Sequence, residues 1–222
     1  MSGEYETAYE ASILRPESFW GEAGAAVEWT RRWDKVLDRS ASPAPRWFVG
    51  GTLNTCYNAV DRHVLAGRGD ATAVIYDSPI TGVTGQLTYA ELLERVSTFA
   101  GALRDLGVEC GDRVVIYMPM IPQTLIAMLA CARIGAVHSV VFGGFAAQEL
   151  AIRIDDAKPK LVVWASCGIE PSRVIPYKPL LDGAIEMAKA KPDHCIICQR
   201  PMETATLIPG RDLDWNDVMA KA

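Results

Sequence analysis

The sequence predicts an α/β protein: a mostly parallel sheet with flanking helices, preceded by an aromatic-rich, largely helical N-terminal extension. After Ala71, short β-branched runs alternate with segments of helical spacing. Strands that alternate with helices of this length imply right-handed β-α-β crossovers and therefore parallel strands. The chain has 222 residues, half of them hydrophobic, which is enough to bury a sizeable core.

The first 65 residues differ from the rest because they are aromatic and irregular. Four of the tryptophans lie between positions 20 and 47. Apolar residues at helical spacing predict a helix over residues 22–37, and residues 47–51 read as a short strand that ends in a turn. The tryptophans could form a ligand surface, but a packing layer against a larger domain is the favoured interpretation.

Periodicity and turn residues set the predicted elements of the remaining chain. Thr88 and Glu91 form the sequence signature of a capping box, which opens a helix that Gly107 ends. The predicted strands cover residues 72–76, 113–117, 136–141, 160–165 and 194–198, and the further helices cover 123–134, 146–156 and 179–189. A parallel sheet needs both faces covered, so the apolar residues of helix 123–134 are assigned to the core.

Composition excludes several classes of protein. The formal net charge is −5 and no basic run occurs, so general nucleic-acid binding is excluded. Charged residues make up 22% of the chain, too few for intrinsic disorder. Residues 114–132 carry no charge, but Pro119 and Pro122 interrupt them. Proline breaks a helix, so a buried strand, a turn and a buried helix are predicted there, with no membrane span.

Cysteine usage favours a reducing compartment. No secretory leader precedes the six cysteines, so free thiols are expected rather than a disulfide framework. Cys195 and Cys198 have the spacing of redox and zinc sites, yet three residues is an odd step in a strand and places the two thiols on opposite faces. Strand packing is the favoured interpretation, and a thiol redox protein is a remaining hypothesis. A cytoplasmic location is predicted, with the mitochondrial matrix as the alternative.

Two loops could carry chemistry at one edge of the predicted sheet. Gly143 and Gly144 follow the strand 136–141, where paired glycines let a backbone approach a ligand and leave amides free for an anion. The loop 165–173 follows the next strand, and Arg173 could grip a phosphate. The alternatives are a plain tight turn for the glycines and, for Arg173, an ion pair with Glu170 or a helix cap. No nucleophile motif or Walker loop appears, so the residues alone stop at a possible anion site.

Taken together, the motifs resemble the AMP-forming short-chain acyl-CoA synthetases, that is, the acetyl- and propionyl-CoA synthetase family. The matching blocks are Trp47-Phe-Val-Gly-Gly-Thr-Leu-Asn54, Asn58-Ala-Val-Asp-Arg-His63, Tyr117-Met-Pro-Met-Ile-Pro122, Ala127-Met-Leu-Ala-Cys-Ala-Arg-Ile-Gly-Ala-Val-His138 and Ser139-Val-Val-Phe-Gly-Gly-Phe145. Tyr76-Asp-Ser-Pro79, Gly168-Ile-Glu-Pro171 and Gly210-Arg-Asp-Leu-Asp-Trp215 are closer to the propionyl branch. The resemblance covers essentially the whole chain.

The resemblance implies a two-step reaction on small-molecule substrates: propionate or acetate, ATP and CoA. The carboxylate attacks the ATP α-phosphate, giving acyl-adenylate and pyrophosphate, and the CoA thiol then displaces AMP. Mg²⁺ shields the phosphates in the full-length enzyme. By the same resemblance, CoA would contact Glu170, Pro171, Ser172, Arg173, Gly143 and Gly144. No catalytic residue and no metal ligand is expected within this sequence.

Two departures bear on that site. Acetyl-CoA synthetases carry arginine where this chain has Glu170, so one phosphate contact is lost or moved. The propionyl branch usually has glycine in place of Ser172, and a side chain there could narrow the approach of CoA.

The resemblance also implies a domain division. Residues 1–65 would be the acetyl-CoA-synthetase-type extension and 66–222 the first part of the AMP-binding domain, ending before the glycine- and threonine-rich ATP loop. An N-terminal fragment, inactive by itself, of a propionate–CoA ligase is therefore expected. Acetate–CoA ligase is the alternative, and so is a non-catalytic interaction module.

Overall fold

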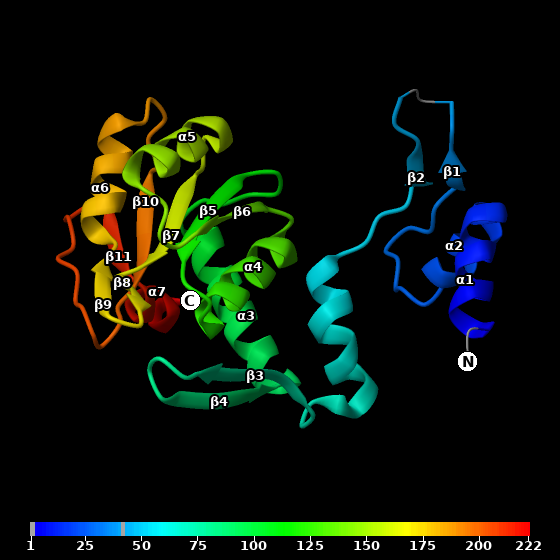
Figure 1. Ribbon diagram of the computed structural model, residues 1–222, viewed down its shortest axis with the longest axis horizontal. Helices are drawn as coiled ribbons and strands as arrows, with labels where there is room; N and C mark the ends of the chain where they lie inside the picture. The colour runs from blue at the N-terminus through cyan, green and yellow to red at the C-terminus, as the bar shows by residue number, and fades with distance from the viewer. Residues whose placement is uncertain (1–2, 41–42) are drawn as a thin grey trace. The chain divides into compact units, whose positions relative to one another are not determined.

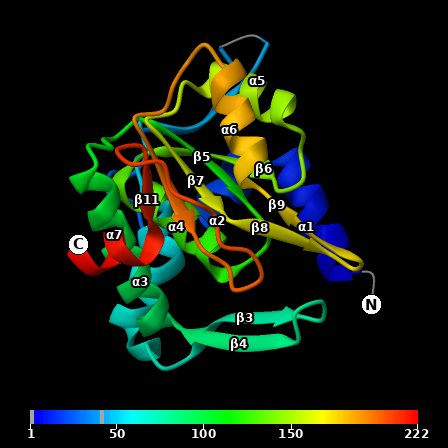
Figure 2. The same cartoon turned by 90° about the vertical axis from the view of Figure 1, so that its left-hand side faces the viewer.

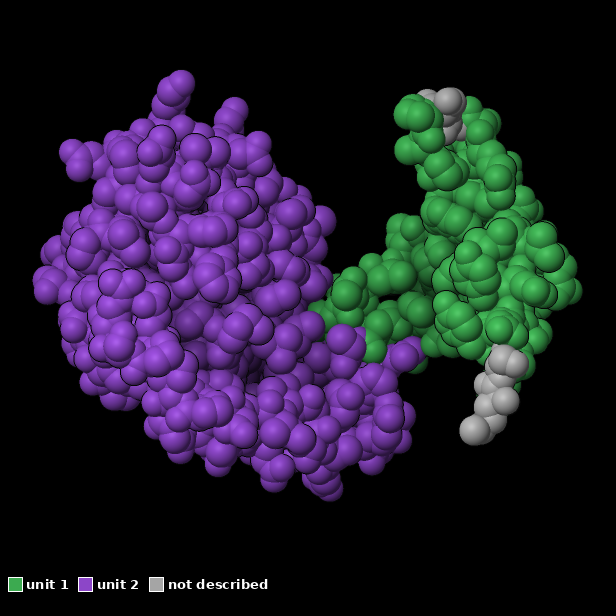
Figure 3. All heavy atoms as spheres, viewed as in Figure 1, with its two compact units in different colours: residues 1–58 green, residues 59–222 purple. Residues whose placement is uncertain are grey.

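The computed structural model describes residues 3–40 and 43–222. The chain separates into two compact units, Met1–Asn58 and Ala59–Ala222, which are coloured differently in Figure 3.

The first unit combines two helices with a small antiparallel sheet. Helix α1 covers Gly3–Leu14 and α2 covers Pro16–Gly24, where Pro16 occupies the first turn, a position that lacks a hydrogen-bond acceptor in any helix. Strands β1 (Lys35–Asp38) and β2 (Arg46–Val49) pair antiparallel. The helical beginning and the short strand near residue 47 are confirmed.

The predicted helix over residues 22–37 is wrong beyond Gly24. The chain leaves the helix there because its aromatic residues pack on one another instead of along a helix face. The rings of Trp29 and Trp33 lie 5.3 and 5.0 Å from that of Phe48 on β2. A Cβ at Gly24 would overlap the Phe48 ring, so this contact also requires a glycine. Trp29 and Trp33 thus pack on Phe48 within this unit, and a packing layer against a larger domain stays a prediction.

A five-stranded parallel sheet forms the centre of the second unit (Figures 1 and 2). Its strands stand in the order β11 (Asp212–Asp214), β10 (His194–Cys198), β7 (Leu161–Ala165), β5 (Arg113–Met118) and β6 (Val137–Phe142). The α/β fold with a parallel sheet is confirmed. Strand β11 and the helix α7 (Trp215–Lys221) after it were not predicted, so 194–198 is not the last strand.

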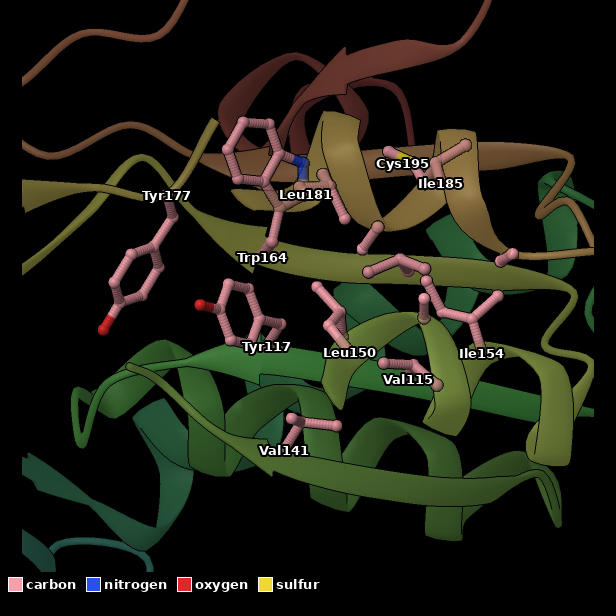
Figure 4. Close-up of a cluster of buried hydrophobic side chains, with 14 of the residues drawn as sticks. Val115, Tyr117, Val141, Leu150, Ile154, Trp164, Tyr177, Leu181, Ile185 and Cys195 are labelled. Atoms are coloured by element: carbon pink, nitrogen blue, oxygen red, sulfur yellow. The ribbon is translucent and has the colours of Figure 1, made fainter. Parts of the chain in front are cut away.

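Helices cover both faces of this sheet, as parallel strands require. Helices α5 (Ala147–Ala157) and α6 (Lys178–Met187) pack together on one face, while α3 (Tyr89–Asp105), α4 (Pro122–Ile134) and α7 lie on the other. The capping box at the start of α3 is confirmed: Thr88 Oγ1 accepts from the Glu91 amide, and Glu91 Oε2 accepts from the Thr88 amide. Figure 4 shows the core between the sheet and the α5–α6 layer.

Further segments lie outside this parallel sheet. Strand β3 (Thr72–Ser78) pairs antiparallel with β4 (Val83–Thr88). A strand was predicted over residues 72–76, but β4 and this pairing were not predicted. Strand β8 (Cys167–Glu170) pairs with β9 (Arg173–Pro176), so the predicted loop 165–173 is largely a hairpin. Two short π-helical segments, Tyr57–Asp61 and Val64–Arg68, precede β3.

Candidate ligand cleft

A cleft of about 350 Å³ opens where β5 and β6 end. Parallel neighbours end at the same edge of a sheet, and this is where ligands bind in open α/β folds. Its walls come from three segments: Met118–Met120 after β5, Val140–Gly144 at the end of β6, and the β8–β9 hairpin with Tyr177 beyond it. Gly143, Gly144 and Glu170, predicted from separate loops, therefore line one cleft.

The glycine pair turns the chain sharply out of β6. Gly144 has a φ of +142°, which side chains disfavour. Gly143 is constrained by space instead, because a Cβ there would lie 2.5 Å from Tyr177 Oη. The turn thus brings main-chain atoms, rather than side chains, to the cleft.

The β8–β9 hairpin positions the charged residues. Glu170 and Arg173 are register partners, with Pro171 and Ser172 at the exposed turn between them. Glu170 Oε2 accepts a hydrogen bond from Arg173 Nε at 2.8 Å. This bond, together with the charge of Glu170, raises the pKa of Arg173. The alternative partner considered for Arg173 is thus the one it contacts here.

That ion pair leaves most of the guanidinium available. The two side chains are 67% and 48% exposed, and exposed pairs contribute about 0–1 kcal/mol. A guanidinium has five N–H donors. Of the five on Arg173, only the Nε–H has a hydrogen-bond partner among the described residues. Arg173 itself stands beside the cleft, while Glu170 is part of its wall.

Two tyrosines near the cleft floor were not predicted as site residues. Tyr117 and Tyr177 are fully buried, with ring centroids 4.8 Å apart. Figure 4 shows both hydroxyl oxygens on the side of the core away from Leu150 and Ile154. Burial raises the pKa of Tyr177 to about 12, so its phenol is protonated at neutral pH. Tyr117 begins one of the blocks that carry the family resemblance, but nothing in the sequence indicates that Tyr177 lines the cleft.

The thiol redox hypothesis does not fit the structure. Cys195 and Cys198 lie within β10 and are buried. Burial raises the pKa of the Cys195 thiol to about 12 and that of Cys198 to about 11. Reactive cysteines need lowered pKa values and access to solvent, so strand packing explains this pair.

Among the described residues, no group of three or more His, Cys, Asp or Glu is placed to hold a metal ion. The charge-free stretch 114–132 folds as β5, a turn and α4, as predicted. None of the helices in the described part of the chain has the length and hydropathy needed to cross a membrane.

Models of two protein families match segments of this chain. The model of the AMP-binding enzyme family matches residues 61–215, and the model of the acetyl-coenzyme A synthetase N-terminus matches residues 5–59. The chain is 56% identical over 220 residues to the mitochondrial acyl-CoA synthetase short-chain family member 3 of Homo sapiens. It is 45% identical over 207 residues to the propionate–CoA ligase of Salmonella typhimurium.

These alignments cover 99% and 93% of this chain but only 32% and 33% of the two relatives, so the chain spans about a third of their length. Among solved structures, an acetoacetyl-CoA synthetase from Streptomyces lividans superposes with a TM-score of 0.86 at 26% identity. That match covers 99% of this chain and 33% of the other. The chain therefore belongs to the AMP-binding enzyme family.

Proposed function

We propose that this chain forms the CoA-binding side of an AMP-forming carboxylate–CoA ligase, with propionate as the acid. One observation carries the proposal: Gly143, Gly144 and Glu170 meet in a single cleft at the carboxyl edge of the sheet, with Arg173 beside it. The reaction joins acid and ATP into acyl-adenylate with loss of pyrophosphate. The CoA sulfur then bonds to the acyl carbon, AMP leaves, and the thiol proton is released.

The propionate assignment rests on similarity. The relative of Salmonella typhimurium is named for propionate, and acetate is the alternative acid. The mitochondrial relative of Homo sapiens supports the matrix as the alternative to a cytoplasmic location. The matched segments also support an extension over residues 1–65 and an AMP-binding segment over 66–222.

No catalytic side chain is assigned within these residues. Their part in the reaction is to receive the phosphorylated end of CoA and orient it. ATP is the second nucleotide substrate. Mg²⁺, which shields ATP phosphates in such reactions, has no fitting ligand set among the described residues, so no step is assigned to it here.

CoA titration by calorimetry tests the Arg173 contact. Arg173→Ala is expected to weaken CoA binding about three- to ten-fold, because a charge-assisted bond to phosphate is lost at an exposed site. Arg31→Ala is the matched control, since Arg31 forms an ion pair of the same spacing with Asp34 at similar exposure. Identical isotherms for wild type and Arg173→Ala would refute the contact.

A chimera tests the ligase assignment. Residues 1–222 would replace the matched third of the Salmonella typhimurium propionate–CoA ligase, and the chimera is expected to retain propionyl-CoA synthesis. In it, Arg173→Ala should raise the KM for CoA while propionate-dependent ATP–pyrophosphate exchange, which needs no CoA, stays unchanged. If Arg173→Ala abolished the exchange, Arg173 would act in the adenylation step, and its assignment to the CoA contact would be wrong.

The 222-residue chain alone is expected to show no such exchange, because its sequence holds no glycine- and threonine-rich phosphate loop. Exchange by the purified chain would contradict this.

A further inference from the structure

Tyr177 brings a donor to the cleft that the protein itself does not use. Its ring is 1% exposed, yet the residue lines the cleft. Within the described residues its hydroxyl makes no hydrogen bond, whereas the hydroxyl of neighbouring Tyr117 donates to the Phe145 carbonyl at 3.0 Å. Although the residue is buried, its hydroxyl is not among the enclosed polar atoms that lack a partner, and Tyr177 lines the cleft. The hydroxyl is therefore free to bond a ligand that enters the cleft.

Two glycines from different elements make room for this hydroxyl. A Cβ at Gly143, in the turn after β6, would lie 2.5 Å from Tyr177 Oη, and a Cβ at Gly168, on β8, would overlap the same atom. Glycine inside a strand weakens it and often marks a place where another group approaches closely. Both glycines also line the cleft, so the hydroxyl that they accommodate lies at the cleft wall.

The surroundings select a neutral acceptor rather than an anion. Glu170 lines the same cleft and repels negative charge, while Arg200, the nearby cation that acts on Tyr177, donates to the Cys167 carbonyl. Met118, Met120 and Ile169 supply apolar surface around it. Arg173 stands beside the cleft, paired with Glu170. A phosphate therefore fits beside Arg173 and an uncharged part of the ligand fits on the floor.

We propose that Tyr177 is a positioning residue for CoA: its hydroxyl donates a hydrogen bond to an uncharged oxygen or nitrogen of CoA, and Gly143 and Gly168 make the room that this hydroxyl occupies at the cleft wall. This rests on the proposed function, because CoA is taken as the occupant of the cleft. The acceptor belongs either to the adenine-bearing nucleotide or to the amides of the pantetheine arm.

Tyr177→Phe removes the hydroxyl and keeps the ring. Its CoA affinity, measured by calorimetry on the 222-residue chain, is expected to fall about three- to ten-fold, the range for one neutral hydrogen bond. The midpoint of thermal unfolding should not change, because no internal bond is lost. Tyr117→Phe is the matched control: it breaks the bond to Phe145 and should lower the unfolding midpoint.

Adenosine 3′,5′-bisphosphate, a nucleotide probe without the pantetheine arm, shows which part of CoA holds the hydrogen-bond acceptor. If Tyr177→Phe weakens this probe as much as CoA, the acceptor is in the nucleotide; if it weakens CoA alone, the acceptor is in the pantetheine arm. Either result supports the proposal. Wild-type affinity of Tyr177→Phe for both ligands, while Arg173→Ala loses affinity, overturns the role of Tyr177 and leaves the proposed function standing. Absence of CoA binding by wild type overturns both.

A double-mutant cycle tests whether Gly143 makes room for the Tyr177 hydroxyl. Gly143→Ala should destabilise wild type more than it destabilises Tyr177→Phe, because Oη is the atom that the new methyl group meets at 2.5 Å. Gly85→Ala is the control, since a Cβ at this strand glycine has no neighbour within 4 Å. Additive unfolding midpoints for Gly143→Ala and Tyr177→Phe would show that Gly143 does not serve the hydroxyl.

Discussion

The side chain of Glu170 sets the charge at the cleft more than any other single residue. Glu170 lines the cleft and accepts a hydrogen bond from Arg173 Nε. Its carboxylate therefore repels an incoming phosphate and also engages part of the Arg173 guanidinium that would bind that phosphate. Both effects act in the same direction. Because both side chains are largely exposed, water and salt moderate them.

Replacing Glu170 by glutamine is therefore expected to strengthen CoA binding. The variant removes a negative charge and keeps the size of the side chain, and a gain of about two- to five-fold in affinity at low salt matches an exposed pair. Calorimetry at two salt concentrations checks this, because the gain should shrink as salt rises. Asp34→Asn, which releases Arg31 in the first unit, is the control. Weaker binding by Glu170→Gln would mean that Glu170 itself contacts the ligand.

Asp212 contributes to stability rather than to the site. Its carboxylate is fully buried, accepts from Arg211 Nε at 2.6 Å and from the Ile208 amide at 2.9 Å, and lies 3.3 Å from Lys178 Nζ. Burial alone would raise the pKa of Asp212. The hydrogen bonds and charges of Arg211, Ile208 and Lys178 outweigh that effect and lower the pKa below its usual range.

Asp212→Asn should lower the free energy of unfolding by about 1–3 kcal/mol at neutral pH, because Arg211 and Lys178 then keep only Asp182 as their anion. A group with a lowered folded pKa stabilises above its unfolded pKa, near 4, and loses that contribution as pH falls further. The difference between wild type and variant should therefore shrink below about pH 4. Urea unfolding from pH 3 to 7 measures it. Asp193→Asn, at an exposed pair with Lys160, should change stability by less than about 1 kcal/mol.

At the scale of elements, residues close together in the sequence correctly predicted the helix ends that short-range interactions determine. Thr88 with Glu91 and the left-handed Gly107 marked the bounds of α3 correctly. The break after Gly24 depends on Phe48, twenty-four residues away, which a helical spacing cannot reveal. Helix α7 was missed although Asp214 caps it by accepting from the Asn216 amide, a signal that the sequence offered. Tyr177 left no such signal, because its position depends on glycines from two other segments.

Strand β6 ends the described parallel sheet, and its outer edge has no strand beside it there. An uncovered apolar edge invites pairing with another chain, and a lysine on such an edge opposes it. Val137, 54% exposed on β6, is the residue to change. Val137→Lys should reduce self-association of the chain at high concentration, as measured by sedimentation velocity. Ile152→Lys, equally exposed but on helix α5, should change it less; equal effects would point to general charge instead.

At the scale of the whole molecule, the proposed CoA site belongs to one unit. Every residue that lines the cleft, and the core beneath it, lies between Ala59 and Ala222. The first unit has its own aromatic packing around Trp29, Trp33 and Phe48. This division predicts that the cleft does not depend on residues 1–58 for its shape.

A chain of residues 59–222 should therefore fold cooperatively and bind CoA within about two-fold of the affinity of the full chain, because the sheet and both helix layers remain complete. Near-ultraviolet circular dichroism during thermal unfolding reports the packing of Trp164 and Tyr177, and calorimetry reports the affinity. Arg173→Ala in the short chain should reproduce its effect in the long one. A cooperative short chain with lost CoA binding would place part of the site in the first unit, whereas a non-cooperative one would show that the larger core needs the smaller unit to fold.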